Sequence, residues 1–357
     1  MDELYDVLEK SLRRQELTDD DLLRLLNCND RDELKKLFAA ARAVRFGEFG
    51  NQVFLYGFVY FSTYCHNNCG FCYYRRENRL PRRYRKSSAE IVATAEELKA
   101  SGVHLLDLTM GEDDYFLEND AERLIELVRT VKHSTGLPIM VSPGVVSVNA
   151  VRELAEAGAD WYALYQETHN ERDFVRLRIA QDYGARMAAK SAAARSGLLL
   201  EEGLMVGLGE SPEDIVKSFH MMKRLCVSQG RCMTFIPQHG TPLEGRERAA
   251  FDMELKIIAA LRLYLPELLI PASLDVDGRK GLKERLLAGA NVVTSIIPPR
   301  KGYAGVANAV QDIDEGFRTV DGIRDTLTEC GMVPASAEEY VKWVEKRKNS
   351  LEGRCGF

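Results

Sequence analysis

The sequence predicts an α/β fold in which eight parallel strands and their helices form a TIM-type (βα)8 barrel. Eight short runs rich in β-branched and aromatic residues alternate with helical segments, which is typical of repeated βα units around a parallel sheet. The chain of 357 residues can hold one barrel of about 250 residues with extensions. We therefore expect an N-terminal helical extension over residues 1–50, a barrel over 51–308 and a C-terminal helical tail over 309–357 that packs on the barrel.

Each element is placed from its residue pattern. Polar starts near Thr18 and Asp30, followed by leucine-rich stripes, predict short helices in the extension. The strands are expected at Val53–Phe61, His104–Thr109, Pro138–Ser142, Trp161–Tyr165, Leu204–Gly207, Cys232–Ile236, Leu269–Ser273 and Asn291–Ile296. The barrel helices are expected at Ala89–Ser101, Asp120–Thr135, Asn149–Ala157, Arg186–Ser196, Pro212–Cys226, Met253–Leu265 and Lys280–Ala290. Two more helices are expected in the tail, at Asp312–Cys330 and Ala337–Leu351.

Polar or glycine-containing loops follow several of these strands. They lie at residues 62–65, 110–113, 142–144, 166–168 and 237–240. Because the active sites of barrel enzymes lie at the C-terminal ends of the strands, we expect the functional site on this rim.

Composition and charge favour a small-molecule substrate. The net charge is −6 and the pI is near 5.7, whereas nucleic-acid-binding proteins concentrate positive charge on one face. We therefore expect no nucleic-acid partner. One basic stretch, residues 75–86, holds seven Arg or Lys residues. We interpret it as a solvated helix start and loop in preference to a docking patch.

The sequence also favours a cytoplasmic protein without a membrane segment. The N-terminus is charged and amphipathic, and no run of about 18 apolar residues occurs. The eight cysteines, three of them crowded together, suit metal ligation in a reducing compartment better than disulfides.

The clustered cysteines are Cys65, Cys69 and Cys72, directly after the first predicted strand. Three thiolates on one loop can bind three corners of an iron–sulfur cube and leave the fourth iron open, as in a catalytic site. A structural zinc site, with His66 or a distant cysteine as fourth ligand, is the alternative, although structural zinc usually uses two separated ligand pairs. The remaining cysteines form no second clustered set: Cys28, Cys226, Cys232, Cys330 and Cys355.

This spacing, with an aromatic residue before the last cysteine, resembles the signature of the radical S-adenosylmethionine (SAM) superfamily. The resemblance implies a [4Fe–4S] cluster held by Cys65, Cys69 and Cys72, with SAM chelating the open iron. It also implies that an electron from the reduced cluster cleaves SAM to methionine and a 5′-deoxyadenosyl radical. The electron would come from a donor such as a flavodoxin or ferredoxin.

Further residues resemble the biotin synthase-like and hydrogenase maturase-like branch of this superfamily. The segment Met110-Gly111-Glu112 resembles the glycine-rich segment that receives the SAM amino group. The residues that the resemblance assigns to SAM binding are Gly111, Glu112, Ser142, Gly144, Glu167 and Arg186. For Arg186, an exposed helix cation is the alternative interpretation.

A longer resemblance, from about Phe46 to about Ala309, points to a mutase family of pyrrolysine biosynthesis. The matching stretches are residues 53–65, 72–74, 107–113, 137–144, 165–168, 233–245, 269–275 and 288–296. The resemblance implies that L-lysine is isomerised to 3-methylornithine, the first step of that pathway, by hydrogen abstraction, fragmentation of the carbon skeleton and recombination. It assigns substrate binding to Asp107, Arg231, Ser273 and Asp275.

The residues themselves support this assignment in part. A lysine-like substrate has one carboxylate and two ammonium groups, so a buried site needs a cation and acceptor groups. Asp107 lies inside an apolar strand, where an unpaired carboxylate is costly. Ser273 and Asp275 are two residues apart and share a face if the chain is extended. A structural carboxylate remains the alternative for Asp107, as does a solvated loop residue for Arg231.

Two other functions compete with a lysine mutase. One is a lyase of the hydrogenase-maturase type that acts on a small thiol compound, whose substrate need not carry two ammonium groups. The other is a noncatalytic iron–sulfur scaffold, which would form no 5′-deoxyadenosine from SAM.

Overall fold

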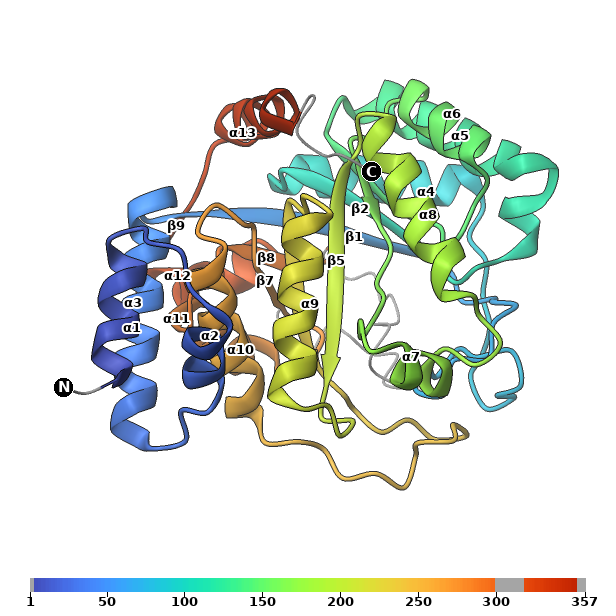
Figure 1. The fold of residues 1–357 in the computed structure, drawn as a ribbon. Coiled ribbons are helices and arrows are strands. Elements are labelled where there is room, and N and C mark those ends of the chain that lie inside the picture. The colour runs from blue at the N-terminus through green and yellow to red at the C-terminus, as the bar shows by residue number, and fades with distance from the viewer. Residues whose placement is uncertain (1–2, 299–317, 352–357) are drawn as a thin grey trace.

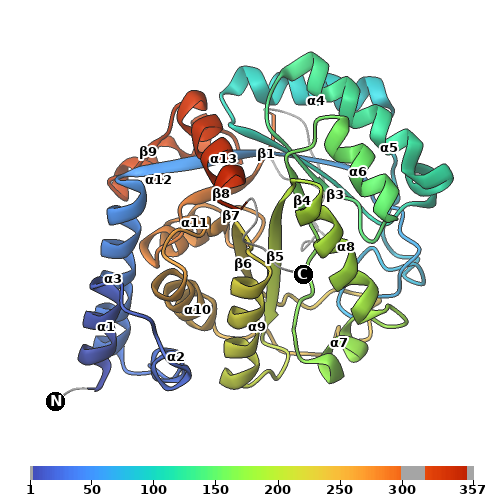
Figure 2. The ribbon, with the colours of Figure 1, turned by 45° about the horizontal axis from the view of Figure 1, so that its top comes forward.

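The computed structural model describes residues 3–298 and 318–351. Eight parallel strands surround the core, and hydrogen-bonded neighbours run in the order β6-β5-β4-β3-β2-β1-β8-β7. The strands are β1 (Gln52–Ser62), β2 (Leu105–Met110), β3 (Ile139–Ser142), β4 (Trp161–Ala163), β5 (Leu199–Val206), β6 (Gln229–Thr234), β7 (Pro271–Ser273) and β8 (Val292–Ile296). This arrangement is a TIM-type (βα)8 barrel (Figures 1 and 2), which confirms the predicted fold class.

The barrel closes only at one end. Gln229 of β6 forms a single parallel bridge with Leu269, just before β7, and the Gly230 amide donates to the Leu269 carbonyl at 2.9 Å. These contacts lie at the N-terminal ends of the two strands. Toward their C-terminal ends no ladder joins β6 and β7 in the described residues, so the side of the barrel is open toward the rim that carries the site.

Helices cover the outside of the barrel (Figure 2). The first three helices pack beside α10. In chain order the helices are α1 (Glu3–Leu12), α2 (Asp19–Leu26), α3 (Arg31–Phe49), α4 (Ser88–Ser101), α5 (Asp114–Thr135), α6 (Val148–Glu156), α7 (Glu171–Leu177), α8 (Tyr183–Arg195), α9 (Pro212–Arg224), α10 (Phe251–Tyr264), α11 (Gly278–Leu287), η2 (Asp321–Ile323), α12 (Arg324–Glu329) and α13 (Ala337–Leu351). No described helix combines the length and apolar character needed to cross a membrane.

Local hydrogen bonds explain where several helices begin. Ser87 and Ser211 each accept a hydrogen bond from the third backbone amide of the helix that follows. Glu90 and Asp214 bond back to the backbone of the two serines. These capping boxes satisfy amides that would otherwise lack partners, so α4 and α9 start within a residue of the predicted positions.

The structure differs from the prediction at several elements. Strand β5 begins at Leu199 rather than Leu204, and the short helix α7 was not predicted. Residues 75–86 contain no helix, because the side chain of Arg83 bonds the carbonyls of the loop. The predicted helix Asp312–Cys330 is reduced to η2 and α12 in its described part, and residues 312–317 lie outside the described residues. A short strand, β9 (Val333–Pro334), pairs with β1.

Candidate active site

A cavity of about 250 Å³ lies at the C-terminal ends of the strands, and every predicted site residue lines it. From the cysteine loop come Cys65, Cys69 and Cys72. The predicted SAM residues in the lining are Gly111, Glu112, Ser142, Gly144, Glu167 and Arg186, and the predicted substrate residues are Asp107, Arg231, Ser273 and Asp275. The fold therefore brings together residues that are more than 200 positions apart in the chain.

The cysteine loop is held from several sides. The Gly70 amide donates to the Leu177 carbonyl of α7 at 2.7 Å. Arg83 donates to the carbonyls of Thr63 at 2.5 Å, Tyr74 at 2.8 Å and Arg75 at 2.7 Å. These hydrogen bonds fix the backbone on both sides of the three thiols. Part of the basic stretch therefore supports the loop and is not merely solvated.

The three thiols suit a polynuclear iron centre. The pKa of Cys65 is raised to about 11 and that of Cys72 to about 12, chiefly by burial, and the charges of the neighbouring thiols act in the same direction. Three thiolates at this place therefore need a strongly cationic partner. Iron supplies that charge, and Cys₃ ligation of a [4Fe–4S] cluster leaves one iron open.

The zinc alternative gains no support from His66. Its Nδ1 lies 2.7 Å from Asp114 Oδ1 and its Nε2 lies 3.5 Å from Glu112 Oε2. Both ring nitrogens thus face carboxylates. Within residues 3–298 and 318–351, no three His, Cys, Asp or Glu side chains are arranged to hold a single ion.

Two glycines at the rim allow close approaches that a side chain would prevent. A Cβ on Gly111 would lie 2.2 Å from the Tyr64 carbonyl oxygen, and one on Gly144 would lie 2.0 Å from the Glu112 side chain. Gly144 also has a φ of +85°. Glu112 is largely shielded from solvent, which alone would raise its pKa, but the hydrogen bond from His66 and the charge of Arg186 outweigh this effect and lower it. The rim therefore holds an ionised carboxylate beside the cysteine loop.

Glu167 and Arg186 both line the cavity, but they do not form a pair with one another. Glu167 Oε1 accepts a hydrogen bond of 2.6 Å from Arg178. Arg186 instead donates to the Tyr165 carbonyl at 2.7 Å and lies 3.4 Å from Glu112. The second oxygen of Glu167 and the Nε of Arg186 are buried without a hydrogen-bond partner among the described residues. These two atoms are available to hydrogen-bond a polar molecule such as SAM.

Asp107 is a buried carboxylate on β2. It accepts a hydrogen bond of 2.7 Å from the Thr109 hydroxyl. Its pKa is raised to about 7, chiefly by burial and then by the charge of Glu201, which together outweigh the Thr109 hydrogen bond and the positive charge of Arg231. A cation brought to Asp107 would be stabilised, because it would restore the ionised form.

Arg231, on β6, is the cation that the sequence predicts for the substrate carboxylate. Its Nε donates to Glu201 at 2.9 Å and one Nη donates to Thr294 at 3.3 Å. Its guanidinium lies over the Tyr165 ring, 5.8 Å from the centroid. It is only 7% exposed, so the alternative of a solvated loop residue is wrong.

Ser273 and Asp275 lie together in the cavity wall, but not on one extended strand. Strand β7 ends at Ser273, and Asp275 lies in the turn that follows. The Asp275 amide donates to Ser273 Oγ at 3.2 Å, which bends the chain back. Asp275 also forms an ion pair of 2.6 Å with Arg318.

Sequence reasoning missed several residues of this site, namely Tyr165, Arg178, Gln181, Glu201 and Arg318. Glu201 had a usable signal, because Glu201 and Glu202 are adjacent carboxylates within an otherwise apolar run. The late start predicted for β5 placed both outside the strand. Arg178 and Gln181 lie between α7 and α8, where no periodic pattern marks the residues.

A βα barrel whose C-terminal rim carries three clustered cysteines beside a cavity with charged side chains in its wall is the architecture of the radical SAM class of enzymes. A sequence profile of the radical SAM superfamily matches residues 59–222. The chain is 45% identical over 332 residues to a 3-methylornithine synthase of Methanosarcina acetivorans, covering 93% of this chain and 94% of the relative. It superposes on a crystal structure of methylornithine synthase with a TM-score of 0.90 at 43% identity, covering 94% of this chain and 99% of that one.

A more distant relative is the [FeFe] hydrogenase maturase subunit HydE of Thermotoga maritima, 31% identical over 81% of this chain and 82% of the relative. The chain belongs to the 3-methylornithine synthase family of radical SAM enzymes. Enzymes of this class use a [4Fe–4S] cluster and SAM, so the cofactors expected from the cysteine motif are confirmed.

Proposed function

We propose that this enzyme isomerises L-lysine to 3-methylornithine, the first step of pyrrolysine biosynthesis. The assignment of lysine as the substrate rests on the placement of Asp107 and Arg231 in one cavity. They come from β2 and β6, which are separated by three strands in the sheet and so lie across the barrel from each other. Opposite charges at two ends of a buried space match a zwitterion with a distal ammonium.

The cofactors fit the end of the cavity near the cysteine loop. Cys65, Cys69 and Cys72 would hold the cluster. When bound, the cluster and SAM supply a 5′-deoxyadenosyl radical that abstracts a hydrogen atom from the substrate. The residues proposed to bind SAM are Gly111, Glu112, Ser142, Gly144, Glu167 and Arg186, all of which line the cavity.

The chain's own residues would bind and orient lysine. Asp107 would receive the distal ammonium, and Arg231 would donate from its free Nη edge to the carboxylate, since its Nε and other Nη already bond Glu201 and Thr294. Ser273 and Asp275 would receive the α-ammonium. Asp107 and Arg231 are buried and Ser273 and Asp275 are half-buried, so little water would compete for these contacts and each would be strengthened.

Substitution of the charged pair tests this assignment. Asp107→Asn keeps the shape but removes the negative charge, so lysine binding should weaken by about 2–5 kcal/mol, the scale for breaking a buried charged pair. Arg231→Lys keeps the charge but loses the planar fork, so turnover should also fall. Iron content, SAM affinity and product mass from labelled L-lysine are measured anaerobically.

The outcomes separate the competing functions. Near wild-type lysine conversion by both variants would show that Asp107 and Arg231 are structural. Formation of 5′-deoxyadenosine without any lysine product would favour a lyase of the hydrogenase-maturase type. Failure to cleave SAM at all would favour an iron–sulfur scaffold.

Serine substitution tests the cluster ligands. Cys65→Ser, Cys69→Ser and Cys72→Ser should each lose the four-iron cluster, because a neutral hydroxyl replaces a thiolate poorly. Cys226→Ser is the matched control, since Cys226 does not line the cavity, and it should retain full iron. A full cluster and normal turnover in any of the first three variants would refute this ligand set.

The electron is proposed to come from an acidic flavodoxin or ferredoxin. Arg76, Arg79 and Arg82 are exposed in the loop that follows the cluster cysteines, although the whole chain carries a net charge of −6. Exposed positive charge steers a negatively charged partner and speeds association at low salt. Replacing the three arginines with Gln should slow reduction by the protein donor but not by dithionite. Equal rates with both donors would contradict this docking face.

A further inference from the structure

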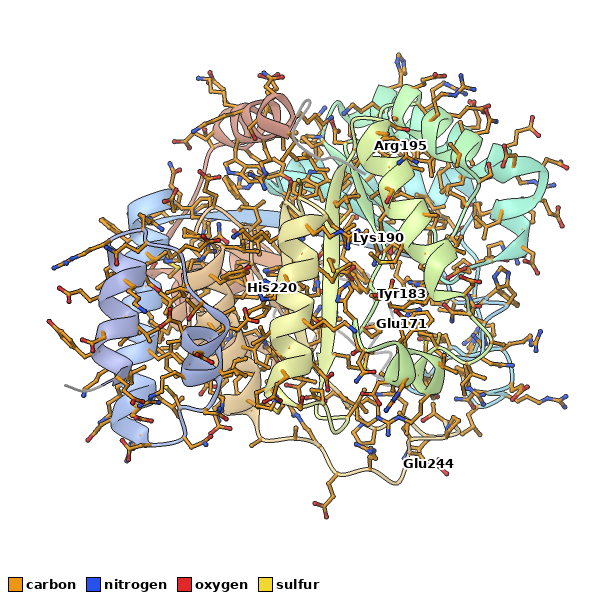
Figure 3. The ribbon with its side chains drawn as sticks, in the orientation of Figure 1. Glu171, Tyr183, Lys190, Arg195, His220 and Glu244 are labelled. Carbon is orange, nitrogen blue, oxygen red and sulfur yellow. The ribbon has the colours of Figure 1, made fainter. Side chains whose placement is uncertain are left out.

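The short connection between α7 and α8 places two hydrogen-bond donors against one cluster cysteine. Gln181 Nε2 lies 3.0 Å from Cys69 Sγ, and Arg178 Nη1 lies 3.7 Å from the same sulfur. Cys69 is 7% exposed and Arg178 is 9% exposed, so little water competes for these contacts. Figure 3 marks Glu171 at the start of α7 and Tyr183 at the start of α8, the two helices that flank this connection.

Cys65 is contacted differently. Its sulfur accepts from the backbone amide of Asn67 at 3.5 Å, a local contact within the cysteine loop. The donors to Cys69 instead come from side chains more than 100 residues away. Among the described contacts of the three ligands, Cys69 is therefore the sulfur that accepts hydrogen bonds from distant side chains.

Both donors are held in place by further bonds. Arg178 Nη2 donates to Glu167 at 2.6 Å, and its guanidinium lies 5.5 Å from the centroid of Phe71. Gln181 Oε1 accepts from Arg186 at 3.1 Å, which orients the amide so that its nitrogen faces the sulfur. Glu167 and Arg186 are two of the proposed SAM residues. The two donors to Cys69 are therefore hydrogen-bonded to two of the residues that we propose to bind SAM.

We propose that Arg178 and Gln181 are positioning residues that raise the reduction potential of the cluster by stabilising negative charge on Cys69. Reduction adds one electron to the cluster from a low-potential donor, and no bond is made or broken in that step. A cation and an N–H donor at a ligand sulfur favour the more negative, reduced state. The same two side chains also fix the positions of Glu167 and Arg186 relative to the cluster cysteines through their hydrogen bonds.

A redox titration of the reconstituted enzyme tests the proposal without lysine. Wild type, Gln181→Leu and Arg178→Met are reconstituted anaerobically, their iron is counted, and the cluster potential is measured by EPR in the absence of SAM. Both variants should keep four irons and show a more negative potential. We expect the reduced-to-oxidised ratio at a fixed potential to fall by about tenfold, which is about 59 mV for one electron.

Matched variants separate charge from contact. Arg176→Met removes an arginine two residues before Arg178, in the last turn of α7. Its side chain bonds the Leu208 carbonyl and Asp173 instead of a cluster sulfur, so the potential should not shift. Arg178→Lys keeps the charge and should shift it less than Arg178→Met. If Arg178→Met fails to assemble a cluster, Gln181→Leu decides, because Gln181 is half-buried and lies outside the helices, just after the turn at Ile179 and Ala180.

Wild-type potentials in both Gln181→Leu and Arg178→Met, with full iron, would overturn the proposal. An equal shift in Arg176→Met would also overturn it, since general loss of positive charge would then be the cause. The proposal rests on the radical SAM assignment, and the two fail differently. A wild-type protein that binds no four-iron cluster would refute that assignment, whereas unchanged potentials with normal turnover refute only the role of Arg178 and Gln181.

Discussion

Asp107 shows how a single buried group can prepare a site for a cation. Its carboxylate lies on an apolar strand and accepts a hydrogen bond from the Thr109 hydroxyl. Burial, reinforced by the charge of Glu201, raises its pKa to about 7. At neutral pH this group is therefore near the midpoint of its titration, and an ammonium group brought beside it shifts it to the ionised form.

This raised pKa predicts the pH dependence of lysine use. Below about pH 7 Asp107 becomes neutral and no longer balances an ammonium, so kcat/KM for lysine should fall as the pH drops through 7. Thr109→Val removes the donor that stabilises the anion, so the pKa of Asp107 should rise and the midpoint should move upward by about one pH unit. Thr109→Ser keeps a hydroxyl and should leave the profile near that of wild type. Identical kcat/KM profiles for the Val and Ser variants would contradict the assignment.

Several residues of the site could be predicted from the sequence because each belongs to a recognisable local pattern. The cysteines form a spaced motif, and Asp107 interrupts an apolar strand. The partners of these residues could not be predicted in the same way. Glu167 pairs with Arg178 rather than approaching Arg186, and that choice depends on how the chain turns between α7 and α8.

At the scale of elements, length and periodicity decide what can be predicted. Helices α4, α9 and α13 have long amphipathic patterns or capping residues, and the predictions lie close to the observed bounds. Helix α7 spans only seven residues, fewer than the window in which periodicity is measured. Strand β5 was placed too late because two adjacent glutamates interrupt its apolar run, although both are buried.

Glu202 also joins β5 to α8. Lys190 points from α8 toward β5 (Figure 3) and forms a fully buried ion pair with Glu202. Glu202 Oε1 also accepts hydrogen bonds from the amides of Gln166 at 2.7 Å and Gly203 at 2.8 Å. The pair therefore anchors the start of the loop that carries Glu167.

We predict that Lys190→Met destabilises the fold by about 3–5 kcal/mol, because it leaves the carboxylate of Glu202 buried without its cation. Adding Glu202→Gln should recover much of that loss, since the amide oxygen can still accept from the backbone. Arg129→Met is the control, because it breaks an exposed pair with Glu126 and should change stability by less than about 1 kcal/mol. Urea unfolding under anaerobic conditions gives the free energies. Equal stability of Lys190→Met and Arg129→Met would contradict a structural role for the pair.

At the scale of the whole molecule, the two ends of the barrel have different tasks. The C-terminal ends of the strands carry the cavity, whereas helix α13 lies at the opposite end (Figure 1). There Tyr340 is fully buried against Phe54 and Tyr56, and Trp343 stacks on Trp161. The tail was predicted to pack on the barrel, and the described part of it closes the end remote from the site.

This division predicts that changes at α13 alter stability but not catalysis. The hydroxyls of Tyr340 and Tyr56 are 2.8 Å apart and both side chains are buried. Tyr340→Phe should cost about 1–3 kcal/mol, because the Tyr56 hydroxyl loses its buried partner. The double variant Tyr56→Phe/Tyr340→Phe replaces both hydroxyls and should be closer to wild type. Tyr340→Ala should cost about 3–5 kcal/mol, since it also opens a cavity.

Unfolding free energies of Tyr340→Phe, Tyr56→Phe and the double variant give the coupling between the two tyrosines, and lysine turnover of Tyr340→Phe is measured well below its unfolding temperature. Turnover should match wild type, because Tyr340 does not line the site cavity. A stability loss in the double variant equal to the sum of the single losses would show that the hydroxyls do not interact. A large fall in turnover of folded Tyr340→Phe would instead show that the geometry of the site depends on packing at the N-terminal end of the barrel.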